Sequence, residues 1–255
     1  MGRRCLLETI LEPGSLRVLF QPVFEADAGR MRVHYLESLV RGPEGTSLEA
    51  PEVLFDYAGR KNAAAAVDRA CVRTILETAR SLPPGATLGI NVHASTLAHD
   101  PEFLSFLGDT ASLHMIDPSR IVLEIVEHAP PWDMAAFRTS LEGLRDIGVR
   151  VALDDVGLGH SNFLMILECR PEYFKIDRYF VADSPRDFHR RVVLASIAEL
   201  AARFGGQAIA EGVETRAELE AVRNLGIELV QGWLFGPARP ATQPWGPQVM
   251  KWSSL

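Results

Sequence analysis

The chain has 255 residues, of which 47% are hydrophobic, and it carries a formal net charge of −7. This length fits one (β/α)8 barrel or two smaller domains, and the apolar fraction allows a sizeable buried core. The negative charge argues against a DNA-binding surface, which usually shows a basic patch, but it does not exclude a small anionic ligand because bound metal ions reverse the local field.

Short apolar runs alternate with helical patterns along the whole chain. The runs are residues 19–24, 33–41, 87–93, 121–127, 150–156, 173–177, 207–213 and 228–235. The helical patterns are residues 50–59, 63–82, 95–108, 134–148, 187–205 and 215–226. This alternation predicts one closed α/β domain, a single TIM-like (β/α)8 barrel in which the first strand can be antiparallel. We expect one domain over residues 1–255, with its core at about 16–240 and a C-terminal helix and tail in 241–255.

Polar residues lie at or near the ends of most of these runs. They are Gln21, Glu37 with Arg41, Asn91, Glu124, Asp154 with Asp155, Lys175, Glu211 and Gln231. A parallel strand buried on both faces is nearly continuously apolar, so an isolated charge within one needs an explanation. In a barrel these strand ends converge at one mouth, where they would form a divalent-metal site.

Strand alternation indicates which side chains share a face. Glu37, Leu39 and Arg41 do so, with Glu37 placed as a deep metal ligand and Arg41 roughly 13 Å further out as an anion clamp. Glu124 and Glu127 fall on opposite faces of the strand, so we predict that Glu124 is a metal ligand and that Glu127 has an outer role.

Asp154 and Asp155 are neighbours and would point opposite ways in a regular strand. Gly157 and Gly159 follow at once, so the strand can break there and turn both carboxylates to the same ions. Oxygen ligands without Cys or His favour Mg²⁺ or Mn²⁺ over zinc. Two such ions would clamp the attacking water and the leaving oxygen of a phosphoryl transfer. The pKa of Lys175 should fall beside them, which suits it to orienting or deprotonating that water.

Each of these residues, taken alone, could instead have a purely structural role. Asn91 alone would be a turn residue or helix N-cap, and Lys175 alone would snorkel or pair with Asp177. Glu37 alone would form a buried ion pair with Arg41. Gln21 and Gln231 alone would satisfy backbone groups. Two adjacent acids such as Asp154 and Asp155 are harder to explain without a cation, because they repel each other.

The three cysteines, Cys5, Cys71 and Cys169, are scattered and odd in number, which indicates free thiols in a reducing compartment. No apolar stretch approaches the roughly 20 residues that span a bilayer. Glu8 and Glu12 interrupt the start of the chain before a signal sequence could form. We therefore expect a cytoplasmic protein with no membrane span.

The motifs resemble those of the EAL-domain cyclic di-GMP phosphodiesterases. Glu37-Ser38-Leu39-Val40-Arg41 is similar to the family signature, with Ser38 in place of Ala. The resemblance runs in register over residues 16–240. It includes Gln21-Pro22-Val23, Asn91, Leu123-Glu124-Ile125-Val126-Glu127, Asp154-Asp155, Lys175-Ile176-Asp177, Glu211-Gly212-Val213-Glu214-Thr215 and Gln231-Gly232-Trp233-Leu234-Phe235.

This resemblance implies a cyclic-guanylate-specific phosphodiesterase that hydrolyses cyclic di-GMP to linear pGpG with two Mg²⁺ or Mn²⁺ ions. One ion would be held by Glu37, Asn91, Glu124 and Asp154, and the other by Asp154, Asp155 and Glu211. Lys175 would position the water, with Glu211 as candidate base. The substrate would contact Gln21, Leu39, Arg41 and Gln231. Glu214 and Glu127 would fix the loops around the site.

The loop after the fifth strand departs from the family pattern Asp-Asp-Phe-Gly-Thr-Gly-Tyr-Ser. Here it reads Asp154-Asp155-Val156-Gly157-Leu158-Gly159-His160-Ser161. In the family this loop positions the second metal and links the site to a dimer partner, and Leu158 lacks the hydroxyl that would bond Glu127. We expect activity that is retained but weak, or dependent on a partner. A homodimer through this loop stays open.

Two other functions are considered. One is a catalytically idle receptor that binds cyclic di-GMP and signals through a partner, but such members lose metal ligands and this chain keeps them all. The other is a metal-dependent barrel lyase or aldolase. It needs a phosphate-gripping Gly-rich loop near the last strands, for which Gln231-Gly232-Trp233 is a poor candidate.

Overall fold

The computed structural model describes residues 5–27, 30–126, 133–158, 163–243 and 249–251. Eight strands close into a barrel, because β1 pairs with both β2 and β8. The strands are β1 (Arg17–Asp27), β2 (Arg30–Arg41), β3 (Leu88–His93), β4 (Ile121–Val126), β5 (Arg150–Val156), β6 (Tyr173–Ile176), β7 (Gln207–Ala210) and β8 (Leu229–Val230). Both neighbours of β1 run antiparallel to it, and the other barrel pairs are parallel. The predicted TIM-like barrel with an antiparallel first strand is confirmed.

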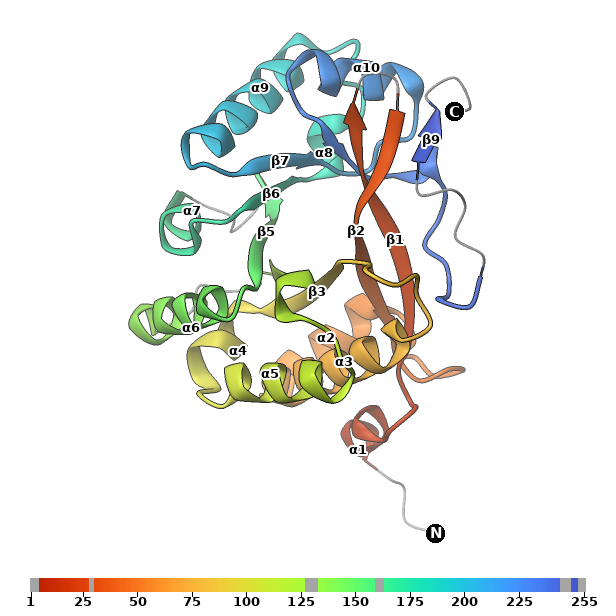
Figure 1. Cartoon of the computed structure of the whole chain (residues 1–255), viewed down its shortest axis with the longest axis vertical. Coiled ribbons are helices and arrows are strands. Elements are labelled where there is room, and N and C mark those ends of the chain that lie inside the picture. Colours follow the sequence, from red (N-terminus) through yellow and green to blue (C-terminus); the bar gives the residue numbers. More distant parts are fainter. Residues whose placement is uncertain (1–4, 28–29, 127–132, 159–162, 244–248, 252–255) are drawn as a thin grey trace.

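Helices surround the strands, as Figure 1 shows. They are α1 (Leu6–Leu11), α2 (Pro51–Arg60), α3 (Ala64–Ala79), α4 (Ala94–His99), α5 (Phe103–Leu113), α6 (Met134–Asp146), α7 (Phe163–Cys169), α8 (Arg178–Val181), α9 (Phe188–Arg203) and α10 (Arg216–Asn224), with 3₁₀ turns η1 (Pro118–Arg120) and η2 (Trp233–Phe235). The predicted helix over 95–108 is two helices, because Pro101 lacks the N–H that a continuous helix needs. The short helices α1, α7 and α8 were not predicted.

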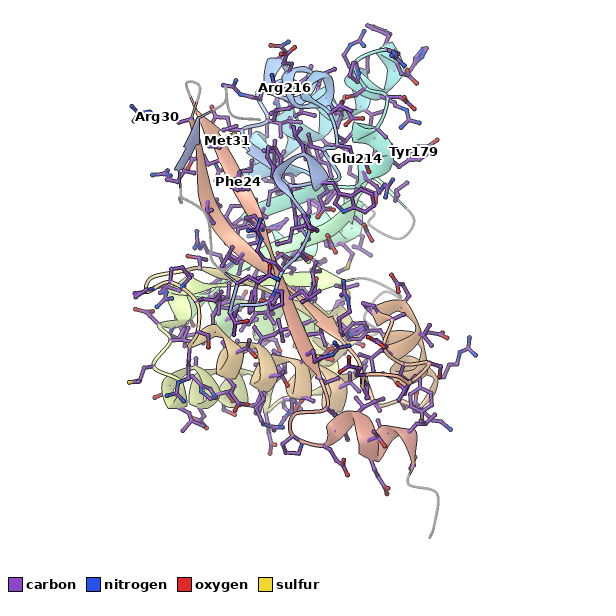
Figure 2. All side chains as sticks on the ribbon, turned by 90° about the vertical axis from the view of Figure 1, so that its right-hand side faces the viewer. Phe24, Arg30, Met31, Tyr179, Glu214 and Arg216 are labelled. Carbon is purple, nitrogen blue, oxygen red and sulfur yellow. The ribbon has the colours of Figure 1, made fainter. Side chains whose placement is uncertain are left out.

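The first two strands form a hairpin longer than predicted. Their pairing runs from Arg17 opposite Arg41 to Asp27 opposite Arg30. Its outer part buries Phe24 and Met31, which Figure 2 labels on the hairpin. Strand β9 (Val249–Lys251) pairs antiparallel with residues 30–32 of β2. The prediction of a helix in 241–255 is therefore wrong for residues 249–251, because the hairpin offers an open edge to which a strand can add.

One layer of apolar side chains fills the inside of the barrel. It consists of Val23, Tyr35, Val122, Ala152, Tyr173, Ile209 and Leu229, all at most 3% exposed. On every one of these strands the polar residue predicted for the site lies two positions away, and therefore on the same inward face. The apolar layer is the floor of the barrel, and the polar residues form the next layer towards its mouth.

Candidate metal and phosphodiester site

The inward layer above the apolar floor brings the predicted residues together at the carboxyl ends of the strands. Asn91 and Glu124 stand opposite each other in the parallel pairing of β3 and β4. Gln21 and Glu37 are partners in the β1–β2 pairing. Glu211 directly follows β7, where its backbone N–H donates to the Ile176 carbonyl at 3.1 Å. Strand register therefore places this layer, and no long loop is needed to assemble it.

The Lys175 ammonium lies at the centre of four carboxylates. Its Nζ is 2.7 Å from Glu124 Oε2, 2.9 Å from Asp154 Oδ1, 3.0 Å from Glu211 Oε1 and 3.4 Å from Glu37 Oε1. The side chain is 1% exposed. The alternatives in which Lys175 snorkels or pairs with Asp177, and Glu37 pairs with Arg41, are wrong. Lys175 pairs with the four inward-facing carboxylates because all five groups lie in the same layer of the barrel.

A set of amides holds Glu37 in place. Gln231 Nε2 donates to Glu37 Oε2 at 2.5 Å, and Asn91 Nδ2 donates to Glu37 Oε1 at 3.3 Å. Gln231 also donates to Gln21 Oε1 at 3.3 Å, and Gln21 donates to the Gly236 carbonyl at 3.4 Å. Gln21 and Gln231, predicted to touch the substrate, thus form a support for Glu37 in this structure.

The pKa values of the buried acids shift in different directions, because burial and mutual repulsion raise them whereas Lys175 and hydrogen bonds lower them. Burial raises the pKa of Glu124 to about 8, with Glu37 and Asp154 adding repulsion that Lys175 only partly offsets. Burial likewise raises the pKa of Glu211 well above its ordinary range. Burial also acts to raise the pKa of Glu37, but the Lys175 ammonium and the hydrogen bonds from Gln231 and Asn91 lower it overall.

Lys175 itself is held in the charged form. Burial lowers its pKa, but the surrounding carboxylates, Asp154 first, raise it well above the ordinary value. In the absence of other cations the ammonium is therefore the resident counter-charge of the site. Its predicted fall in pKa applies to a site that contains metal ions and stays a prediction.

Asp154 and Asp155 turn to the same side, as predicted. The pairing of β5 with β6 shifts register between Leu153 and Val156, and Asp155 has a left-handed backbone with φ 51°. The break thus falls on Asp155 itself, ahead of the predicted position at Gly157. Carboxylate oxygens of Asp154, Asp155 and Glu211 all lie within 4.8 Å of one another. Burial, together with Asp154 and Asp177, raises the pKa of Asp155 to about 6.

The donor set fits hard divalent cations. All ligand atoms offered are carboxylate or amide oxygens, which Mg²⁺ and Mn²⁺ prefer. Among the described residues, three buried side-chain oxygens in this layer accept no hydrogen bond: Asn91 Oδ1, Glu124 Oε1 and Gln231 Oε1. Buried acceptors normally find a donor, so these oxygens are free to coordinate a cation or to accept hydrogen bonds from water.

Two cavities open on either side of the acidic centre. The larger, about 900 Å³, extends from Glu37, Asn91 and Asp154 along Leu39 and Arg41 to helix α2, where it is lined by Pro51, Phe55, Asp56 and Arg60. The smaller, about 200 Å³, is lined by Gln21, Glu37, Asp177, Arg178, Glu211, Gly212, Glu214, Gln231, Gly232 and Trp233. Glu37 borders both, so the carboxylates lie between them.

Sequence reasoning missed a buried acid beside the site. Asp68 on α3 is 0% exposed. It accepts the His93 backbone N–H at 3.0 Å and the Thr96 hydroxyl at 2.5 Å, and its Oδ1 lies 2.9 Å from His93 Nδ1. These contacts fix the turn from β3 into α4, two residues after Asn91. The signal in the sequence was Asp68 inside the Ala-rich helical pattern over 63–82, where Glu77 is the other acid.

The remaining predicted residues lie at the edge of the site. Arg41 is half-buried, and Glu214 forms an ion pair with Arg178 at 3.6 Å. Glu127 and His160 lie outside the described residues. Leu158 donates its backbone N–H to the Asp155 carbonyl at 3.1 Å, and Val156 is 2% exposed. The altered side chain at 156 is therefore part of the core.

Comparisons with known proteins agree with this geometry. The family model described as "EAL domain" matches residues 4–238. An uncharacterized protein of Mycobacterium tuberculosis is 31% identical over 236 residues, covering 90% of this chain and 37% of that protein. Cyclic di-GMP phosphodiesterase NbdA of Pseudomonas aeruginosa is 27% identical over 240 residues, covering 92% and 30%. The chain thus spans less than half the length of these curated relatives.

A solved structure shows the same fold. The manganese/cyclic di-GMP complex of Klebsiella pneumoniae BlrP1 at pH 9.0 superposes with a TM-score of 0.79 at 27% identity, covering 89% of this chain and 57% of that chain. That complex contains a divalent metal and a cyclic dinucleotide. Separately, none of the helices in the described part of this chain is long and apolar enough to cross a membrane.

Proposed function

This chain belongs to the EAL domain family, and from that premise we propose that it hydrolyses one phosphodiester bond of cyclic di-GMP to give linear pGpG. The observation that carries the proposal is the layer of carboxylates gathered around Lys175 between two cavities. Cyclic di-GMP phosphodiesterase NbdA and the BlrP1 complex support the choice of substrate.

Two Mg²⁺ or Mn²⁺ ions would be held by the residues of this layer and would supply charge compensation for the transferring phosphoryl group. We assign Glu37, Asn91, Glu124 and Asp154 to one ion and Asp154, Asp155 and Glu211 to the other. The unpartnered oxygens of Asn91 and Glu124 support the first assignment. The mutual proximity of the carboxylates of Asp154, Asp155 and Glu211 supports the second.

The protein's own groups would position and activate the attacking water. Lys175 Nζ has three N–H donors and faces four carboxylates, so it would bind the water through a donor that becomes free when a carboxylate takes an ion instead. Glu211 Oε1 lies 3.0 Å from that ammonium, within reach of the same water, and would accept its proton. Outside this centre, Arg41 would pair with a substrate phosphate, with Leu39 beside it on the wall of the larger cavity.

A homodimer through the loop after β5 is part of the proposal. Helix α7, which follows that loop, exposes three large apolar side chains, Phe163 (74%), Leu164 (47%) and Leu167 (57%). Apolar side chains grouped on one short helix are typical of a protein–protein contact. We also assign the protein to the cytoplasm, where its free cysteines, Cys5, Cys71 and Cys169, would stay reduced.

The proposal is tested by incubating the purified chain with cyclic di-GMP and Mg²⁺ or Mn²⁺, and following pGpG by chromatography with an EDTA control. Metal-dependent pGpG is the expected result and would show that Val156 and Leu158 are tolerated. Measurable ligand binding with no product would instead support the receptor function. Neither binding nor product would refute the choice of substrate.

A further inference from the structure

The apolar floor of the barrel lacks a side chain at Gly89 on β3. Each of the other seven strands contributes one buried side chain to this layer. On β3 the corresponding position is Gly89, which pairs with Val122 of the floor and lies two residues before Asn91. Protein interiors are closely packed, so neighbouring side chains have to fill the space above this glycine.

The side chains that fill this space are those of Tyr35 and Glu124. A Cβ atom at Gly89 would lie 2.4 Å from Glu124 Oε1 and 2.7 Å from Tyr35 Cε2, so any larger residue would displace both groups. Glu124 Oε1 therefore lies over Gly89 on the side of the Tyr35 ring. The other carboxylate oxygen, Oε2, accepts a hydrogen bond from the Lys175 ammonium at 2.7 Å.

The Tyr35 hydroxyl and Glu124 Oε1 are a buried donor and a buried acceptor that complement each other. Neither atom has a hydrogen-bond partner among the described residues. Leaving two such groups unpaired is costly, whereas a bond between them removes both penalties. Burial, followed by the charge of Glu124, raises the pKa of Tyr35 well above its ordinary value, so the hydroxyl keeps its proton and remains a donor.

A second tyrosine of the floor has its hydroxyl in a different environment. The rings of Tyr173 and Tyr35 have centroids 5.8 Å apart. The Tyr173 hydroxyl lies 2.9 Å from His34 Nε2 and accepts a hydrogen bond from Arg150 Nη1 at 2.6 Å. Arg150 is the first residue of β5, at the end of the barrel opposite the metal site. Of these two neighbouring phenols, that of Tyr35 is therefore the one buried against the acids of the site.

We propose that Tyr35 is a positioning residue for Glu124, whose Oε1 accepts a hydrogen bond from the Tyr35 hydroxyl so that the carboxylate is held in the orientation that binds a cation. This inference rests on the proposed function, in which Glu124 is a metal ligand. A carboxylate oxygen has more than one acceptor site, so Oε1 can accept this bond and still take part in cation binding. Hydrogen bonds to a ligating carboxylate orient it and strengthen metal binding.

The first test compares Tyr35→Phe with Tyr173→Phe. Both changes remove one buried hydroxyl and keep the ring in the floor, but only the first removes the donor to Glu124. Mn²⁺ affinity is measured by calorimetry without substrate, and kcat and KM for cyclic di-GMP are measured at saturating Mn²⁺. We expect Tyr35→Phe to weaken Mn²⁺ binding roughly tenfold or more and to lower kcat, with KM within about twofold of the parent. Tyr173→Phe should keep the parental Mn²⁺ affinity.

The second test uses Gly89→Ala, because a methyl group at this position would separate Tyr35 from Glu124 Oε1. We expect this variant also to weaken Mn²⁺ binding. Groups that act through one shared contact show non-additive effects, so Tyr35→Phe combined with Gly89→Ala should bind Mn²⁺ about as well as Gly89→Ala alone. Additive losses would show that the two positions act independently and would overturn the proposal.

The Mn²⁺ affinities separate this inference from the proposed function. Parental affinity in Tyr35→Phe would refute the role of the hydroxyl, as would an equal loss in Tyr173→Phe, because the effect would then lie in the packing of the floor. The proposed function would stand in either case if the parent hydrolyses cyclic di-GMP. If the parent binds Mn²⁺ without hydrolysing cyclic di-GMP, the proposed function falls and the affinities still decide the role of Tyr35. A parent that binds no Mn²⁺ would refute both.

Discussion

Replacing Lys175 by methionine tests whether the ammonium is the counter-charge of the site. The side chain is 1% exposed and lies within 3.4 Å of four carboxylates. Methionine has a similar length and fills the space without the charge. In the absence of divalent cations the four carboxylates would then face one another inside the protein, with no positive group between them.

The expected loss of stability is large. Removing one partner of a buried ion pair typically costs about 3–5 kcal/mol, because the remaining charge stays buried and uncompensated. For a chain of this size that corresponds to a fall in Tm of roughly 10 °C. In EDTA the carboxylates would reduce the cost by taking up protons, so the loss should be smaller at pH 5 than at pH 8.

The sign of this pH effect follows from the raised pKa of Glu124. Burial raises that pKa to about 8, from an ordinary value of 4.5. The folded state therefore binds the proton more tightly than the unfolded state. The stabilisation is complete below about pH 4.5 and is lost as the pH rises to about 8. Stability of the metal-free protein should fall over this range, and more steeply in Lys175→Met.

Thermal unfolding in EDTA and in Mg²⁺, at pH 5 and pH 8, measures both effects. Lys61→Met is the matched control, since Lys61 is exposed and its ammonium is 5.9 Å from the ring centre of Tyr57. Mg²⁺ should restore most of the lost Tm of Lys175→Met, because cations replace the missing charge, but should not restore hydrolysis. A Lys175→Met variant as stable as the parent in EDTA at pH 8 would refute the assignment of the ammonium as counter-charge.

Three further changes test other parts of the site. Glu37→Ala should abolish hydrolysis while cyclic di-GMP binding persists, because it removes a ligand and spares Arg41; hydrolysis at the parental rate would refute the metal assignment. Burial raises the pKa of Glu124 to about 8 and that of Asp155 to about 6, so Mn²⁺ affinity measured by calorimetry should rise about tenfold or more from pH 6 to pH 8, and a flat profile would contradict the role of these acids. Asp68→Ala should lower the free energy of unfolding in urea by about 3 kcal/mol, because the His93 N–H and the Thr96 hydroxyl lose a buried acceptor. An unchanged unfolding midpoint would show that Asp68 does not stabilise the turn from β3 into α4.

Strand periodicity allowed the sequence to predict which polar side chains face into the barrel. Glu37, Glu124 and Lys175 each stand two residues after a buried residue on the same strand, so alternation alone fixes their direction. Strand alternation could not predict which of the inward-facing side chains form ion pairs with one another. Lys175 pairs across the barrel with β2, β4, β5 and the residue after β7, and such distances depend on the curvature and closure of the sheet.

Packing outside the barrel was less predictable. Asp68 belongs to a helix, and its partners lie 25 and 28 residues later in the chain. The outer half of the β1–β2 hairpin and the short strand β9 are stabilised by pairing with each other, so neither shows a strong local pattern. Helix α1 has six residues, too few for periodicity to identify it.

Asp155 shows how a local exception marks the site. Five non-glycine residues in the described part of the chain have positive φ: Asn62, Met115, Arg170, Asp183 and Asp155. The first four follow the ends of α2, α5, α7 and α8, where a left-handed residue commonly terminates a helix. Asp155 lies inside β5 and has no helix to terminate. Such a conformation costs about 1–3 kcal/mol and persists only where the surroundings enforce it. Here it turns a second carboxylate towards Asp154 and Glu211, against electrostatic repulsion that a divalent cation bound among the three carboxylates would offset.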